Sequence, residues 1–121
     1  MIQQVKAQIT KAFVNFSKKD GLPMQEMRVR LTIFNGKLNY YLLHNKEEVR
    51  KTDLTEMVGF TYALLAEGKL TDSVKKTIIE NNVNESTANV RLYLLKDNSP
   101  AAYLFDAGKP IKQIDIDKLI N

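Results

Sequence analysis

The sequence predicts an α+β fold: an antiparallel sheet built from two β-hairpins, with helices packed on one face of the sheet. Two segments, 27–43 and 89–106, alternate apolar and polar residues on both sides of a short turn, which is typical of hairpins. Other stretches place apolar residues at helical spacing, which predicts helices with one apolar face. We therefore expect a single domain over residues 1–121.

The first helix is predicted from Val5, Ile9 and Phe13, which recur at the spacing of one helix face. Gly21 and Pro23 should end it, because glycine adopts the left-handed conformation that closes a helix and proline cannot continue one.

The first hairpin turns at Asn35-Gly36, the residue pair best suited to the positive φ angles of a type I′ turn. A two-residue turn fixes the register, so Phe34 should pair with Lys37 and Arg30 with Tyr41. Strand alternation then assigns the residues to two faces. The core face should carry Met27, Val29, Leu31, Ile33, Leu38, Tyr40 and Leu42, and the opposite face Arg28, Arg30, Thr32, Phe34, Asn39, Tyr41 and Leu43.

A second helix should begin after Asp53, which can accept hydrogen bonds from backbone N–H groups while Glu56 occupies the reciprocal capping position. We expect Gly68 to end this helix and Thr71 or Asp72 to start a third one, closed by Asn81-Asn82.

The second hairpin, 89–106, is expected to turn through Lys96-Asp97-Asn98. A three-residue loop places Arg91 opposite Tyr103, as Arg30 lies opposite Tyr41, and either arginine could stack on its tyrosine. A short strand over 111–116 and a final helical turn complete the chain.

The two hairpin regions also match each other, which suggests an internal duplication of an α-β-β-α unit. Residues 41–58 align with 103–120 without a gap, and the corresponding tandem units are 1–60 and 61–121. The alternative is that shared hydrophobic periods alone produce the match, since identities are few. Both explanations stay open on the sequence.

Composition limits the class of protein. The net charge of +4 comes from the first half, where residues 1–60 hold ten Lys/Arg and six Asp/Glu; residues 61–121 hold eight of each. The sequence has no long apolar run, so it predicts neither a membrane-spanning helix nor a signal peptide. The chain has no cysteine, which fits a cytoplasmic location. We expect a basic, cytoplasmic protein without contact to a membrane.

No catalytic, cofactor-binding or metal-binding constellation is visible, so we expect no enzyme and no cofactor. His44 is the single histidine and has no motif around it, and we expect it to be solvent-exposed or at a sheet edge. The repeated Asp53 and Asp115 could form an acid–base pair, but each precedes an apolar run where N-capping explains it.

The face opposite the core is the predicted working surface, because it mixes cations with aromatic rings. The expected partner-binding residues are Arg28, Arg30, Tyr41, Arg91, Tyr93, Tyr103 and Phe105. Aromatic and arginine side chains dominate protein interfaces, so we expect a protein-interaction module that binds a protein partner or, most simply, a second copy of itself as a homodimer. The alternative is nucleic-acid binding through the basic and aromatic sheet face of the N-terminal half.

Overall fold

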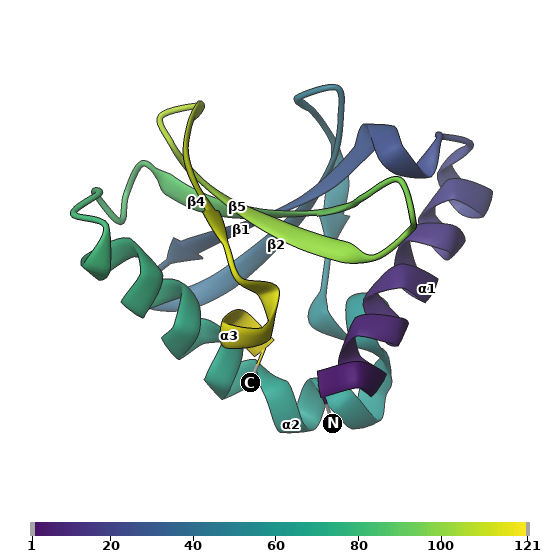
Figure 1. Cartoon of the computed structure of the whole chain (residues 1–121), viewed down its shortest axis with the longest axis horizontal. Helices are drawn as coiled ribbons and strands as arrows, with labels where there is room; N and C mark the ends of the chain where they lie inside the picture. Colours follow the sequence, from purple (N-terminus) through teal and green to yellow (C-terminus); the bar gives the residue numbers. More distant parts are fainter. Residues whose placement is uncertain (1, 121) are drawn as a thin grey trace.

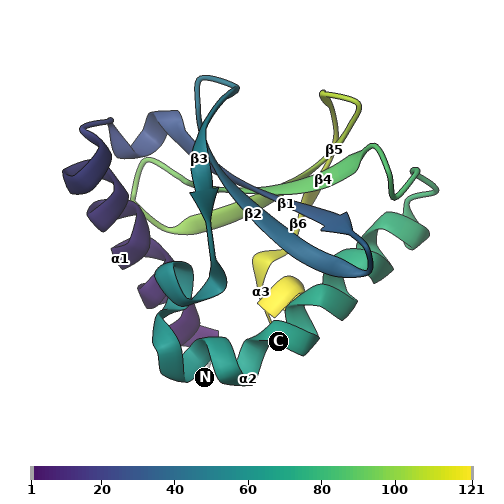
Figure 2. The ribbon, with the colours of Figure 1, turned by 180° about the vertical axis from the view of Figure 1, so that it is seen from behind.

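The computed structural model describes residues 2–120, including all of their side chains except those of residues 2, 60, 61 and 64–66. One six-stranded antiparallel sheet crosses the molecule, and the three α-helices lie on one side of it (Figures 1 and 2). The predicted α+β class, with helices on one face of an antiparallel sheet, is confirmed. Within the described residues, no helix is long and apolar enough to cross a membrane.

The helices are α1 (Ile2–Asp20), the 3₁₀ turn η1 (Met24–Glu26), α2 (Leu54–Glu80) and α3 (Ile116–Ile120). The strands are β1 (Met27–Phe34), β2 (Lys37–His44), β3 (Glu47–Thr52), β4 (Ala88–Leu94), β5 (Pro100–Asp106) and β6 (Lys109–Ile114). Their order across the sheet is β3-β2-β1-β4-β5-β6, so two three-stranded meanders meet where β1 pairs with β4.

Local turn chemistry fixes both hairpins. Asn35 and Gly36 have φ angles of 53° and 75°, as a type I′ turn requires, and β1 pairs with β2 in the register expected from it. In the second hairpin, the Leu95 N–H donates to the Ser99 carbonyl at 2.9 Å, which leaves a three-residue loop in which Asn98 has φ 65°. Arg91 consequently lies opposite Tyr103.

The core lies between the sheet and the helices. Alternate residues of β1, β2, β4 and β5 point toward the helices, and helical spacing brings Ile9 and Phe13 of α1 and Ile78 of α2 against them. The residues predicted for the core face of the first hairpin belong to this core, with Leu38 half-buried at its margin. Burial of these side chains is the main stabilising term of the fold.

The predicted boundary between the second and third helices was wrong. Gly68 is an interior residue of α2, and the helix instead kinks at Gly59, whose φ of 78° and ψ of 158° are not helical. A glycine inside a helix costs only about 1 kcal/mol, so Gly68 is tolerated there. Gly59 adopts a backbone conformation that is almost restricted to glycine.

The two meanders share several backbone details. Both outer hairpins turn through paired positive-φ residues, Asn45-Lys46 and Ala107-Gly108. Each edge strand then carries one bulged residue, Val49 in β3 and Ile111 in β6, and these two residues correspond in the alignment of 41–58 with 103–120. The two halves are therefore alike in geometry, while duplication of an ancestral unit stays a prediction.

Candidate partner-binding face

The candidate site is the sheet face that points away from the helices, called the outward face below. The outer turns of β2–β3 and β5–β6 rise on this side (Figures 1 and 2). The register places all seven predicted partner-binding residues on it, and each of them is half-buried. They are Arg28, Arg30, Tyr41, Arg91, Tyr93, Tyr103 and Phe105.

Arg30 and Arg91 occupy the middle of the outward face. They lie directly opposite each other on β1 and β4, and the pairs Val29–Leu92 and Leu31–Val90 flank them. Exchanging the two halves of the chain leaves this pairing pattern unchanged, because Val29-Arg30-Leu31 corresponds to Val90-Arg91-Leu92. The like-charged pair thus sits on the local pseudo-twofold axis of the sheet.

Each arginine of the outward face covers an aromatic ring. The guanidinium carbons of Arg28 and Arg30 lie 5.1 and 5.0 Å from the ring centres of Tyr93 and Tyr41. The stacking of Arg30 on Tyr41 agrees with the sequence prediction.

In the second hairpin the predicted stacking was wrong in one respect. Arg91 lies opposite Tyr103, but its guanidinium carbon stands 4.0 Å from the ring centre of Phe105, the diagonal neighbour. The rings of Tyr103 and Phe105 contact each other, with their centres 5.7 Å apart and their planes inclined at 57°. A long side chain on a twisted sheet reaches diagonal neighbours as readily as the residue opposite.

The hydrogen bonds of the three arginines differ. Arg30 donates to Glu48 on β3 at 2.7 Å, forming an ion pair. Arg28 donates to the carbonyl oxygens of Gln25 and Met27, both at 2.8 Å. Arg91 donates through Nε to the amide oxygen of Asn89 at 3.2 Å, and within residues 2–120 it forms no ion pair.

The pKa of the Arg91 guanidinium is lowered, first by burial and then by the positive charges of Arg30 and Arg28. Arg30 is paired with Glu48 of β3, but the residue that corresponds to Glu48 in the second half is Pro110 of β6. Arg91 therefore has no carboxylate at the equivalent position to raise its pKa. The outward face therefore holds a cation that no carboxylate among the described side chains of residues 2–120 neutralises.

A shallow groove of about 480 Å³ runs along one side of this face. Arg30, Tyr41 and Glu48 line it together with Phe34, whose side chain is 67% exposed. The sequence predicted Leu43 on the same face, but its side chain is fully buried. Leu43 lies beside the bulge of β3, where the pairing of β2 with β3 shifts by one residue. The outward face thus offers both apolar surface and positive charge to a partner.

The other residues weighed as chemical groups have structural roles. The Nε2 atom of His44 lies 2.9 Å from a Glu26 carboxylate oxygen at the end of β2. Asp53 accepts from the Glu56 N–H at 2.7 Å and Asp115 from the Asp117 N–H at 3.0 Å, so each carboxylate caps a helix, as predicted. Within the described part of the chain, no cluster of three or more metal-ligating side chains is found.

Two features of this face were missed at the sequence level. The ion pair of Arg30 with Glu48 and the stack of Arg28 on Tyr93 join strands that are not consecutive hairpin partners. Alternation in β3 could have placed Glu48 outward, but only the strand order puts Arg28 beside Tyr93.

Comparison with known proteins gives no functional lead: no protein-family model, no curated protein and no solved structure matches this chain.

Proposed function

We propose that this chain is a non-catalytic protein-interaction module whose outward face binds a partner protein that presents carboxylate groups. The observation that carries the proposal is the environment of Arg91. It is half-buried on Phe105, opposite a second arginine, and without an ion pair among residues 2–120.

Electrostatics favour an acidic partner. A carboxylate that reached Arg91 would pair with its free guanidinium edge and reduce its repulsion with Arg30. A hydrogen bond to a charged group contributes about 1.5–3 kcal/mol, and the arginine is already held in place by its ring. Little side-chain entropy would be lost on binding, which favours affinity.

A second copy of the chain, the simplest partner on the sequence, fits this charge pattern less well. A homodimer whose twofold axis passed through the middle of the face would bring Arg30 and Arg91 of both copies together. Such a dimer needs an offset arrangement in which Glu48 of one copy meets Arg91 of the other. Light scattering distinguishes self-association from the binding of a different protein.

Nucleic-acid binding is also less well supported. Guanidinium groups already cover the rings of Tyr41, Tyr93 and Phe105, whereas stacking of bases needs free ring faces. Part of the basic excess of the first half also lies elsewhere, since Arg50 is paired with Asp20 and Glu56. A cytoplasmic location stays a prediction from the cysteine-free composition.

Fluorescence anisotropy with labelled peptides tests the proposal. Peptides that combine Asp or Glu with aromatic residues should bind, and a basic peptide of equal length and aromatic content should not. Arg91→Ala should weaken binding by about tenfold, the effect of one charge-assisted hydrogen bond. Lys18→Ala removes an equal charge from an exposed position on α1 and should change nothing.

Three results would contradict the proposal. Acidic peptides that bind Arg91→Ala as well as wild type would remove Arg91 from the site. Binding restricted to a single-stranded oligonucleotide, with a steep salt dependence, would favour the nucleic-acid alternative. A dimer that persists at high salt in light scattering and is lost in Tyr93→Ala/Phe105→Ala would favour a second copy.

A further inference from the structure

The two halves of the molecule differ at the junction between a helix and the edge strand beside it. In the first half this junction contains Arg50 of β3, Asp20 at the end of α1, and Glu56 in the first turn of α2. Arg50 donates to both oxygens of Asp20 at 3.1 Å and to those of Glu56 at 3.0 and 3.1 Å. Its guanidinium carbon also lies 5.3 Å from the ring centre of Phe16. Arg50 and two carboxylates thus close the junction, and Lys19 lies 3.7 Å from the carboxylate of Glu56.

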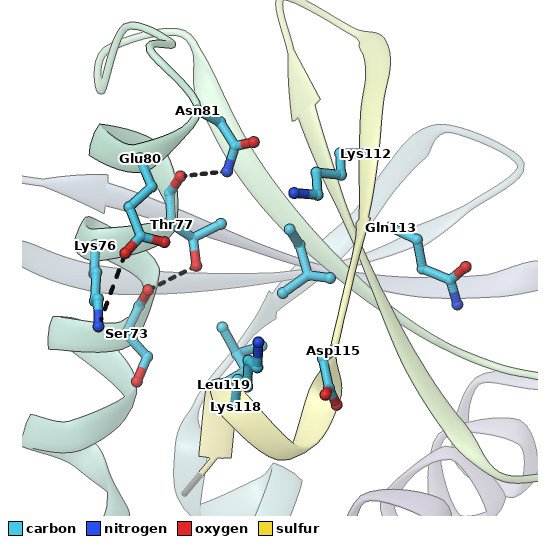
Figure 3. A pocket seen from close by; sticks show the side chains of 11 residues that line it. Ser73, Lys76, Thr77, Glu80, Asn81, Lys112, Gln113, Asp115, Lys118 and Leu119 are labelled. Carbon is cyan, nitrogen blue, oxygen red and sulfur yellow. Dashed lines mark hydrogen bonds and ion pairs between the residues drawn. The ribbon is translucent and has the colours of Figure 1, made fainter.

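The second half has a groove of about 530 Å³ at the corresponding place. It is lined by the last turns of α2, by β6 and by α3, and Figure 3 shows Lys112 pointing across it from β6 toward α2. This volume suits a small ligand, and the lining is mostly polar.

The correspondence between the two junctions follows from the backbone. The alignment of 41–58 with 103–120 equates Arg50 with Lys112 and Glu56 with Lys118. At the helix ends, Gly21 and Asn82 both have positive φ angles, 70° and 54°, which equates Asp20 with Asn81. The cation is kept in the second half, while both carboxylates are replaced, one by an amide and one by another cation.

The charges that remain in the second-half groove are partly engaged. Glu80 pairs with Lys76 at 3.8 Å, and Asp115 accepts the Asp117 N–H as the cap of α3. Lys112 and Lys118 form no ion pair within residues 2–120. The groove is therefore lined by three lysines and two carboxylates, and Lys112 and Lys118 stand without an ion pair at the positions where the first half has Arg50 and the carboxylate of Glu56.

We propose that the second-half groove binds a small oxyanion, a phosphate or carboxylate group of a free ligand, between Lys112 and Lys118. The ligand oxygens would take the place that the carboxylates of Asp20 and Glu56 occupy beside Arg50. The proposal concerns a different surface from the outward face and does not depend on it.

The probes are inorganic phosphate and succinate, titrated separately into the labelled full chain at low ionic strength and followed by NMR shifts of backbone amides. Saturable shifts are expected near Ser73–Asn81 and Lys112–Leu119. Comparison of the two titrations distinguishes a phosphate from a dicarboxylate ligand. Lys112→Gln/Lys118→Gln should weaken binding at least about tenfold. Lys96→Gln, which removes a charge from the exposed β4–β5 turn, should not.

A second variant tests the comparison between the halves. Asn81→Asp/Lys118→Glu rebuilds the two carboxylates around Lys112, so it should abolish the shifts caused by phosphate and succinate. Arg91→Ala should leave those shifts unchanged. Non-saturating shifts spread over all lysines, or equal affinity in Lys112→Gln/Lys118→Gln, would overturn the proposal. So would an unchanged anion affinity in the rebuilt variant.

Discussion

Arg30 and Arg91 lie directly opposite each other on β1 and β4, with both guanidinium groups on the outward face of the sheet. Like charges placed opposite each other on neighbouring strands are destabilising. Glu48 offsets the charge of Arg30, whereas no residue of the described chain offsets that of Arg91. We therefore expect the charge of Arg91 to lower the stability of the fold.

Arg91→Met should therefore raise the free energy of unfolding, by up to about 1 kcal/mol. The substitution removes the repulsion with Arg30 and Arg28, while the thioether keeps a contact with the Phe105 ring. Urea denaturation measures the change, and the gain should shrink at high salt because salt screens the repulsion. A loss of stability at every salt concentration would show that Arg91 stabilises the fold.

Arg50→Met should act in the opposite direction and lower the free energy of unfolding by about 2 kcal/mol or more. The substitution leaves the carboxylates of Asp20 and Glu56 near each other without the cation that binds both. Since Met replaces Arg in both experiments, the two variants form a matched pair. Equal effects of Arg50→Met and Arg91→Met would contradict the distinction drawn between the two arginines.

The same network predicts how stability depends on pH. Hydrogen bonds from Arg50, followed by one from Thr52, hold the pKa of the Glu56 carboxyl below its ordinary value of 4.5. A carboxyl with a lowered folded-state pKa stabilises the protein fully above its unfolded-state pKa, and this contribution is lost as the pH falls through the folded-state value. The stabilisation should therefore be present at pH 7 and disappear progressively below about pH 4.5.

Glu56→Gln makes that dependence measurable. The variant should be less stable than wild type at pH 7, and the difference should narrow on acidification below the ordinary pKa of a glutamate. Glu85→Gln, in the exposed loop after α2, serves as the control and should follow wild type. A difference between Glu56→Gln and wild type that stays constant with pH would exclude titration of Glu56 as the cause.

The kink of α2 gives a prediction from two glycines in one helix. Gly59→Ala should destabilise the protein by about 1–3 kcal/mol, because the backbone of Gly59 is strained for any residue with a Cβ. Gly68→Ala should stabilise it by about 0.5–1 kcal/mol, since Gly68 has open space around its Cα and ordinary helical geometry. Thermal unfolding of both variants checks the pair, and a stabilising Gly59→Ala would place the kink elsewhere.

Three glycines show where prediction from the sequence succeeded, at Gly36, and where it failed, at Gly59 and Gly68. The turn at Asn35-Gly36 was predictable because its chemistry is local, and its register then determined which residues of β1 and β2 face the core. Gly68 and Gly59 look equivalent in the sequence, but only Gly59 leaves the helical conformation in the structure.

The candidate face was predictable residue by residue but not as an arrangement. Alternation assigned Arg28 and Tyr93 to one face, while their contact depends on the pairing of β1 with β4, which joins segments far apart in the chain. The ion pair of Arg30 with Glu48 likewise depends on the position of β3, which pairs with β2 through a bulge and does not pair with β1. Contacts that cross strand pairs of this kind leave no periodic signal in the sequence.

The bulges at Val49 and Ile111 have a consequence for behaviour at high concentration. An open sheet edge is a template for aggregation, because its free backbone groups can pair with a strand of another molecule. Here each edge strand is six residues long and carries a bulge; β3 has four charged side chains, and β6 has two together with Pro110, which has no N–H to donate. Neither edge offers a flat run of backbone, so we expect the protein to resist fibril formation at concentrations where flat-edged sheets polymerise.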